Sequence, residues 1–156
     1  MQVTLERATM PTDDVRALID ALNTELAQGY EPHQQHGLSL EKLFQPHIAF
    51  FIARAGGEAV GCGGVAFDDG IAEVKRMYVR PSVRGTGVAQ AVLARLEAEA
   101  RAKGYRHLML ETGDDLAAAH RLYTRAGFRR CEVFGPYRTM RPHQIERSWF
   151  FEKVLA

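Results

Sequence analysis

A turn with two glycines separates a predicted strand from the longest predicted helix, and it limits the fold more than any other feature. Residues 79–89 read VRPSVRGTGVA, with Gly85 and Gly87 directly before the helical pattern. The apolar positions that follow recur at three- and four-residue steps, as on one face of an amphipathic helix: Val88, Val92, Leu93 and Leu96. Gly104 is suited to end this helix. The chain must therefore pass from strand to helix within a few residues.

The strand after this helix completes a βαβ unit. It is expected at 108–112, and such a connection places its two strands side by side and parallel. Apolar runs bounded by turn residues predict other strands near 3–5 and at 48–54, 59–67, 71–79, 128–133 and 149–154. Helical spacing predicts further helices over 12–29 and 116–126. This order indicates an α/β fold of the α+β kind, with a mixed sheet and helices on both of its faces.

Length and composition indicate one globular domain. The chain has 156 residues, of which 46% are hydrophobic and 25% charged, so residues 1–156 are expected to form a single domain. The formal net charge of +1 creates no field that would recruit nucleic acid or an anionic membrane. The sequence also lacks a basic face and a helix-turn-helix pattern, so neither a DNA-bound regulator nor a membrane partner is expected.

The N-terminus and the cysteines indicate a reducing compartment. The segment MQVTLERATM contains charges and lacks the apolar core of a signal peptide, and no apolar run reaches the roughly eighteen residues of a membrane span. Cys62 and Cys131 lie far apart and form no CxxC pair, which is typical of reduced core residues. We expect a cytoplasmic protein with free thiols.

The glycine turn has the features of an anion site. Backbone N–H groups at the start of a helix lie at the positive end of its dipole, and glycine lets a phosphate approach the main chain. Arg84 adds a planar cationic donor fork. The turn lacks the Lys-Ser/Thr pair of a nucleotide-triphosphate loop and the third glycine of a dinucleotide fingerprint. A diphosphate is the natural ligand, and a purely structural turn is the alternative.

Two separated motifs give the chain a family resemblance. From Glu73 onward it contains, in order, EVKRMYV, RPSVRGTGVA, AQAVLARLEAEARAKGY, HLMLET and AAAHRLYTRAGF. In this order the segments resemble the GNAT N-acetyltransferase superfamily, and the resemblance covers roughly residues 47–154. It implies the GNAT fold, in which a central, mixed and mostly antiparallel sheet is splayed between its fourth and fifth strands.

The resemblance also implies acetyl-CoA as cosubstrate and no metal. The diphosphate would bind the main-chain N–H groups of Arg84, Gly85, Gly87, Val88 and Ala89. The pantetheine arm would pair with the backbone of the preceding strand at Met77 and Val79. The residues that the resemblance assigns to acetyl-CoA are Met77, Tyr78, Val79, Arg84, Gly85, Thr86, Gly87, Val88, Ala89, Leu116 and Tyr123. Two positions depart from the family's pattern: Ser82 stands where Gln or Arg is usual, and Leu116 where many relatives have Asn or Gln. Four basic residues are candidates to contact the 3′-phosphate end of coenzyme A, with a solvated face as the alternative: Arg101, Lys103, Arg129 and Arg130.

Three residues are candidates for the chemistry of acetyl transfer, which needs a neutral amine, a polarised carbonyl and a proton for the leaving thiolate. Tyr123 matches the family's tyrosine near the sulfur, so the resemblance implies that it protonates the thiolate. Glu73 occupies the strand position where some members carry a general base or water-positioning residue, and Glu111 is the competing carboxylate. Parallel strands would bring both carboxylates to one cleft. A backbone N–H near Val79 would polarise the carbonyl.

The acceptor amine is expected to bind at the segments 28–45 and 134–147. Their polar and aromatic candidates are Tyr30, His33, His36, Tyr137 and Arg138. No metal is expected, because the pair His33 and His36 has no evident third ligand. His120 is expected on a helix surface. We predict an acyl-CoA-dependent N-acetyltransferase that acts on a primary amine of a small molecule or peptide in a ternary complex, as a monomer or a homodimer. The alternative is a non-catalytic acyl-CoA-binding sensor.

Overall fold

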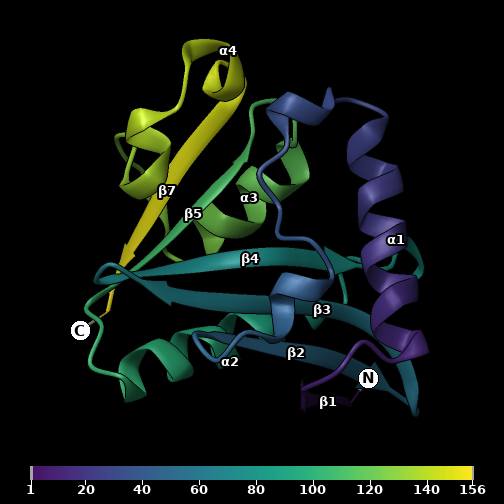
Figure 1. The fold of residues 1–156 in the computed structure, drawn as a ribbon. Coiled ribbons are helices and arrows are strands. Elements are labelled where there is room, and N and C mark those ends of the chain that lie inside the picture. The colour runs from purple at the N-terminus through teal and green to yellow at the C-terminus, as the bar shows by residue number, and fades with distance from the viewer. Residues whose placement is uncertain (1, 156) are drawn as a thin grey trace.

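Seven strands form one open sheet in the order β1-β2-β3-β4-β5-β7-β6 (Figure 1). The computed structural model describes residues 2–155. The strands are β1 (Val3–Ala8), β2 (Ile48–Ala55), β3 (Glu58–Asp68), β4 (Ile71–Val79), β5 (His107–Gly113), β6 (Arg129–Arg130) and β7 (Ser148–Val154). Within these residues β4 and β5 pair in parallel, and all other neighbours are antiparallel. The expected mixed and mostly antiparallel sheet is confirmed.

β4 and β5 separate soon after they meet. Their register joins Ala72 to Leu108 and Glu73 to Met109, and both strands continue beyond these pairs. In Figure 1 the two strands diverge toward their carboxyl ends. The expected splay is therefore confirmed. Because β5 turns away, the β5-facing edge of β4 has no strand partner after Glu73 in the part of the chain that the structure describes.

Helix α1 (Asp13–Ala27) covers one face of the sheet. Thr12 caps it by accepting a hydrogen bond from the Val15 N–H at 3.4 Å, and two aspartates in its first turn complement the helix dipole. Its buried side chains and the strand residues beneath them are Val15, Leu18, Ile19, Leu22, Phe50, Ile52, Cys62 and Tyr78. The apolar stripe read from the sequence is the face that packs on the sheet.

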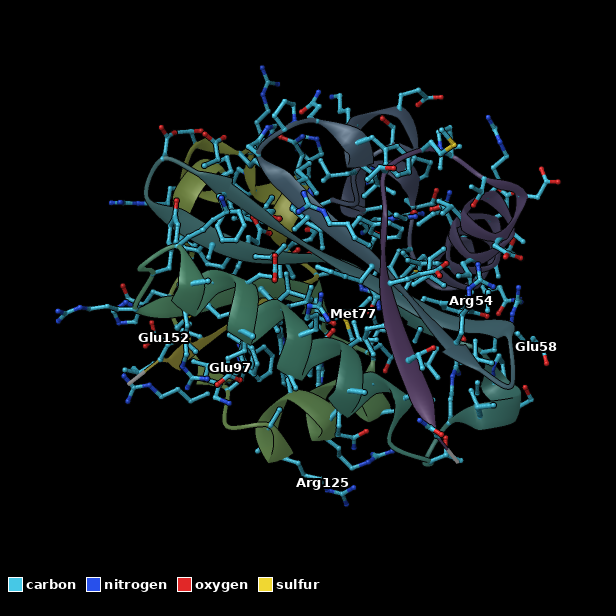
Figure 2. The ribbon with its side chains drawn as sticks, turned by 90° about the horizontal axis from the view of Figure 1, so that it is seen from below. Arg54, Glu58, Met77, Glu97, Arg125 and Glu152 are labelled. Atoms are coloured by element: carbon cyan, nitrogen blue, oxygen red, sulfur yellow. The ribbon has the colours of Figure 1, made fainter. Side chains whose placement is uncertain are left out.

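Helices α2 (Val88–Ala102) and α3 (Ala117–Arg125) cover the opposite face, which Figure 2 shows from below. Phe51 points to this side, whereas its neighbours on β2 point to α1. The helical residues buried here are Val88, Val92, Leu93, Leu96, Ala100 and Tyr123. The expectation of helices on both faces is confirmed. No helix within residues 2–155 combines the length and the apolar character that crossing a membrane requires.

The predicted strand at 128–133 is wrong for most of its length. Only β6 is extended there, at the edge of the sheet, where it pairs with two residues of β7. One more backbone bond follows, from the Cys131 N–H to the Phe150 carbonyl at 2.9 Å. The chain then leaves the edge because Phe134 packs into a small cluster with Tyr137 and Phe150. Tertiary burial, which local apolar composition cannot reveal, ends this strand early.

The two segments expected to bind the acceptor contain short helices. Residues 28–45 hold the 3₁₀ turns η1 (Pro32–Gln34) and η2 (Glu41–Phe44), and residues 134–147 hold η4 (Gly135–Thr139) and helix α4 (Pro142–Ile145). A proline lies in the first turn of η1, η4 and α4, where its fixed φ suits a helix start and its missing N–H is not needed. Both segments are therefore folded against the domain.

The two cysteines differ in accessibility and give a first testable prediction. Both are free thiols, but Cys62 is fully buried and burial raises its pKa to about 12, whereas Cys131 is partly exposed. Since the thiolate is the reactive form, we expect iodoacetamide at pH 8 to label Cys131 at least about a thousandfold faster than Cys62. Mass spectrometry of native and urea-unfolded protein measures both rates. Equal labelling of the two thiols in native protein would contradict the buried position of Cys62.

Candidate active site

A cavity of about 670 Å³ opens between the diverging ends of β4 and β5. Its walls come from α1, the segment 30–37, β4, the start of α2, β5 and α3. The predicted site residues that line it are Glu73, Met77, Tyr78, Val79, Arg84, Gly85, Val88, Ala89, Glu111, Leu116 and Tyr123. Thr86 and Gly87 lie outside this lining, at the start of α2. The splay thus brings residues from distant parts of the chain to one place.

The glycine turn forms one wall of the cavity. Gly85 and Gly87 have φ values of +81° and +97°, a left-handed region that favours glycine. The first hydrogen bond of α2 runs from the Ala91 N–H to the Gly87 carbonyl at 3.1 Å. The N–H groups of Val88 and Ala89 precede this bond, so they lie among the donors that a helix leaves unpaired at its positive end. The turn can bind an oxyanion.

Arg84 is engaged with the protein in this structure. Its backbone N–H donates to the Pro81 carbonyl at 3.3 Å within the turn η3 (Pro81–Val83). The expectation that this N–H is free to bind the diphosphate is therefore wrong. Its guanidinium donates to the Val79 carbonyl at 3.0 Å and to Glu25 at 2.8 Å. Both charged side chains of the Arg84–Glu25 pair are largely exposed, so the pair is weak and an anion at the turn would compete with Glu25.

The basic residues expected near a 3′-phosphate lie away from the cavity. Arg101 pairs with Glu97, Arg129 pairs with Glu152, and the Arg130 guanidinium lies 3.7 Å from the ring centroid of Trp149. Figure 2 labels Glu97 and Glu152, the partners of two of these arginines. None of the four residues named for this role, Lys103 included, lines the cavity. The arginines of α3 that line it are Arg121 and Arg125.

Tyr123 reaches the cavity from α3 and is 7% exposed. Its ring meets Phe128 and Phe151 at centroid distances of 5.8 and 6.2 Å. The adjacent Leu122, although it is the more hydrophobic residue, is less buried than Tyr123. Burial raises the pKa of the Tyr123 hydroxyl above its ordinary value, and the nearby Glu111 carboxylate adds to the rise. The hydroxyl is therefore protonated at neutral pH and can donate a proton.

The two candidate carboxylates line the same cavity, as the parallel strands predict. Glu73 is 7% exposed, accepts a hydrogen bond from the Tyr137 hydroxyl at 2.6 Å and pairs with Lys75 at 3.1 Å. It is therefore a buried group and not a solvent-facing strand glutamate. Glu111 accepts a hydrogen bond from the Ser148 hydroxyl at 2.7 Å, and burial raises the pKa of its carboxyl group.

The segments expected to bind an acceptor contribute part of the wall. Tyr30, His36 and Tyr137 line the cavity, whereas His33 and Arg138 do not. The His36 Nε2 lies 2.7 Å from the Gln144 carbonyl, which ties the two segments together. The described residues contain no cluster of three or more histidine, cysteine or acidic side chains that could hold a metal ion.

His120 is held more firmly than the sequence predicted. His120 is not a free surface residue, because its ring stacks on Trp149 at 4.4 Å and its Nε2 lies 2.7 Å from the Gly113 carbonyl. In the sequence, the only indication that His120 lies near the site was its position one turn before Tyr123.

Lys75 and Arg76 of β4 both line the cavity and were not among the predicted site residues. An alternating strand would place only one of them on a given face, so no local pattern could reveal this.

Comparisons with known proteins agree on one family. The sequence profile described as Acetyltransferase (GNAT) family matches residues 16–128. The IAA acetyltransferase of Azospirillum brasilense is 42% identical over 155 residues, which cover 98% of this chain and 98% of that protein. The match therefore extends over nearly the whole of both sequences.

Solved structures share the fold. A protein of Klebsiella pneumoniae, named for acyl-CoA N-acyltransferase activity, has a TM-score of 0.82 at 35% identity and covers 99% of both chains. The paia N-acetyltransferase of Thermoplasma acidophilum, solved in complex with coenzyme A, has a TM-score of 0.71 at 16% identity and also covers 99% of both chains. At this low identity the second likeness concerns the fold alone.

Proposed function

Because the chain belongs to the GNAT acetyltransferase family, we propose that it transfers an acetyl group from acetyl-CoA to the primary amine of a small molecule or peptide. The observation that carries this proposal is the cavity at the β4–β5 splay. It is lined by the glycine turn, by the buried tyrosine Tyr123 and by the carboxylates Glu73 and Glu111. An anion site, a proton donor and proton acceptors therefore meet in one place.

The residues present fit an acyl-CoA. The N–H groups at the start of α2 suit a diphosphate. The two glycines with positive φ carry no side chain, so a phosphate can approach the main chain there. Beyond Glu73, the open edge of β4 offers the backbone of Met77 and Val79 to an extended amide-containing arm. The coenzyme A complex of the Thermoplasma acidophilum protein supports this choice of ligand for the fold. When bound, acetyl-CoA would supply a thioester carbonyl activated toward amines.

The proton acceptor that we favour is Glu111. Glu73 is held by two donors, the Tyr137 hydroxyl and the Lys75 ammonium, which stabilise its carboxylate. Glu111 has one short bond, from Ser148, and burial raises the pKa of its carboxyl group toward neutrality. A general base is most effective when its pKa lies near the working pH, and burial moves the pKa of Glu111 in that direction. Glu73 would then keep Lys75 and Tyr137 in place beside the amine.

We assign to Tyr123 the donation of a proton to the leaving thiolate. As the amine nitrogen bonds to the carbonyl carbon, the carbon–sulfur bond breaks and the sulfur needs a proton. The Tyr123 hydroxyl lines the same cavity and carries its proton at neutral pH. The amine proton goes to Glu111, directly or through water, and the tyrosine proton goes to the thiolate. Charge is thus balanced without a covalent acyl-enzyme, in a ternary complex.

The test combines a panel of primary amines with detection of free thiol. We expect calorimetry to show acetyl-CoA binding, and at least one amine to cause steady release of coenzyme A. Binding without turnover on any amine would favour a non-catalytic acyl-CoA sensor. Absence of binding to well-folded protein would overturn both functions, since each depends on the glycine turn.

A further inference from the structure

A β-bulge in β4 redirects one arginine. On β3, Cys62 pairs with Tyr78 and Gly64 pairs with Lys75, so a single β3 residue lies opposite two residues of β4. Arg76 is one of these two, and its φ of +56° is uncommon for a residue other than glycine. Bulges of this kind re-aim side chains and are frequent beside functional sites. Here the bulge lets consecutive side chains reach the α1 side of the sheet.

The contacts of Lys75 and Arg76 confirm this direction. Lys75 donates to the His36 carbonyl at 3.3 Å, and Arg76 donates to the side-chain oxygen of Asn23 on α1. The Arg76 guanidinium also packs against Gly37, where an added Cβ would overlap it unless the arginine side chain moved. The segment containing His36 and Gly37 therefore covers the two basic side chains on the wall of the cavity.

Arg76 is a buried cation without a carboxylate. It is 8% exposed, its Nε has no hydrogen-bond partner, and no acidic group forms an ion pair with it within residues 2–155. Burial lowers the pKa of Arg76 but leaves an arginine charged at neutral pH. By contrast, Lys75 is already neutralised by Glu73. Among the cavity-lining residues that the structure describes, Arg76 is thus the buried cation that no carboxylate neutralises.

An uncompensated buried charge is costly, and a guanidinium cannot reduce this cost by losing its proton. An anionic ligand in the cavity would supply the missing partner. Two parallel N–H donors of a guanidinium match the two oxygens of a carboxylate, which adds orientation to attraction. The glycine turn already provides separate donors for a diphosphate, on a different wall. The charge of Arg76 therefore remains available for the second substrate.

We propose that Arg76 binds an oxyanion group of the acceptor, so that the acceptor is an amine that also carries a negative charge, with an amino carboxylate as the best geometric fit. This inference rests on the proposed acetyl transfer. Arg76 would anchor the oxyanion near α1 and so orient the amine toward Glu111 and Tyr123, which line the same cavity. It would act as a binding and specificity residue and take no part in proton transfer.

The first experiment compares matched acceptors on wild-type protein. Each amino acid is tested beside its carboxamide, which keeps the amine and removes the charge, and beside the aminoalkylphosphonate of similar length. We expect kcat/KM to be about 10- to 100-fold higher for an oxyanion-bearing amine than for the neutral carboxamide. A preference for the phosphonate would identify the oxyanion as phosphonate. Equal or better use of the carboxamides would overturn the proposal.

The second experiment tests Arg76 directly. Arg76→Met should lower kcat/KM for the charged acceptor by about 10- to 100-fold, mainly through KM, and leave the carboxamide rate within about twofold. Arg76→Lys should retain part of the preference, because it keeps the charge and loses the planar fork. Arg54→Lys is the matched control, since Arg54 on β2 pairs with Glu6 of β1 and Asp14 of α1 and does not line the cavity. Equal losses for both acceptors would show a merely structural role and overturn the proposal.

Binding measurements separate this inference from the proposed function. With coenzyme A present, calorimetry should detect the amino acid on wild-type protein and about 10-fold or weaker binding on Arg76→Met. If no amine is acetylated but this difference is found, the acetyl transfer fails and the oxyanion site stands. If amines without an oxyanion are acetylated and oxyanion-bearing amines are not bound, the acetyl transfer stands and the oxyanion site fails. Should Arg76→Met fail to fold, the acceptor comparison on wild-type protein still decides the question.

Discussion

Tyr123→Phe is expected to lower kcat by about two to four orders of magnitude, while the affinity for acetyl-CoA stays within about twofold. The substitution removes only the hydroxyl oxygen, and the remaining ring keeps its packing against Phe128 and Phe151. What is lost is the proton that would stabilise the leaving thiolate. Because the change affects a group used only during the reaction, kcat and kcat/KM should fall together.

Steady-state kinetics with thiol detection, combined with calorimetry for acetyl-CoA, measures this effect. Tyr105→Phe is the control, because Tyr105 is also partly buried against an aromatic ring, that of Phe67 at 5.1 Å, but does not line the cavity. The control should keep full activity. Equal rates for wild-type and Tyr123→Phe protein would remove the tyrosine from the mechanism and leave water as the proton source.

Gly87→Val is expected to weaken acetyl-CoA binding by about a hundredfold or more. Gly87 has a φ of +97°, and a β-branched residue there introduces strain on the order of 1–3 kcal/mol. A side chain at this position would meet no protein atom within 4 Å, so the fold itself offers no clash. The loss should arise because the turn relaxes and its N–H groups no longer converge, and because the added methyl groups occupy space near the diphosphate.

A second glycine provides a matched control for this substitution. Gly57, in the β2–β3 turn, also has a positive φ, of +83°, and open space around it, but it does not precede the N–H groups at the start of α2 as Gly87 does. Gly57→Val should lower thermal stability by a similar amount and leave acetyl-CoA affinity unchanged. Calorimetry and thermal unfolding of both variants separate strain from ligand binding. Unchanged affinity in Gly87→Val would mean that the turn serves only to join strand and helix.

The parts of the fold that the sequence predicted well depend on local signals. The helix that became α2 was visible because its apolar stripe recurs with the helical period, and the glycines before it marked the turn. Together with its flanking strands it forms a strand–helix–strand unit, a connection whose two strands are parallel neighbours, as β4 and β5 are. The placement of Glu73 and Glu111 in one cavity was a direct consequence.

Other features of the candidate site could not be predicted from local pattern. The strand expected at 128–133 ends early because Phe134 is drawn into a cluster with Phe150, and these two residues are distant in sequence. Tyr123 is more buried than its neighbour Leu122 because α3 packs on Phe128 and Phe151. Hydrophobicity alone ranks the leucine first. Burial depends on which elements meet, and that is a property of the whole domain.

The sequence by itself determined the order of the elements, the glycine turn and the residue types available for acetyl transfer, because periodicity and backbone preference act over a few neighbouring residues. Only the tertiary structure decided which charges are compensated. Glu73 acquires Lys75 and Tyr137 as partners, whereas the bulge in β4 turns Arg76 toward Asn23 and leaves its charge unpaired in the described part of the chain. The physical reason is that the energy of a charge depends on the groups that surround it, and folding brings these groups together from distant positions.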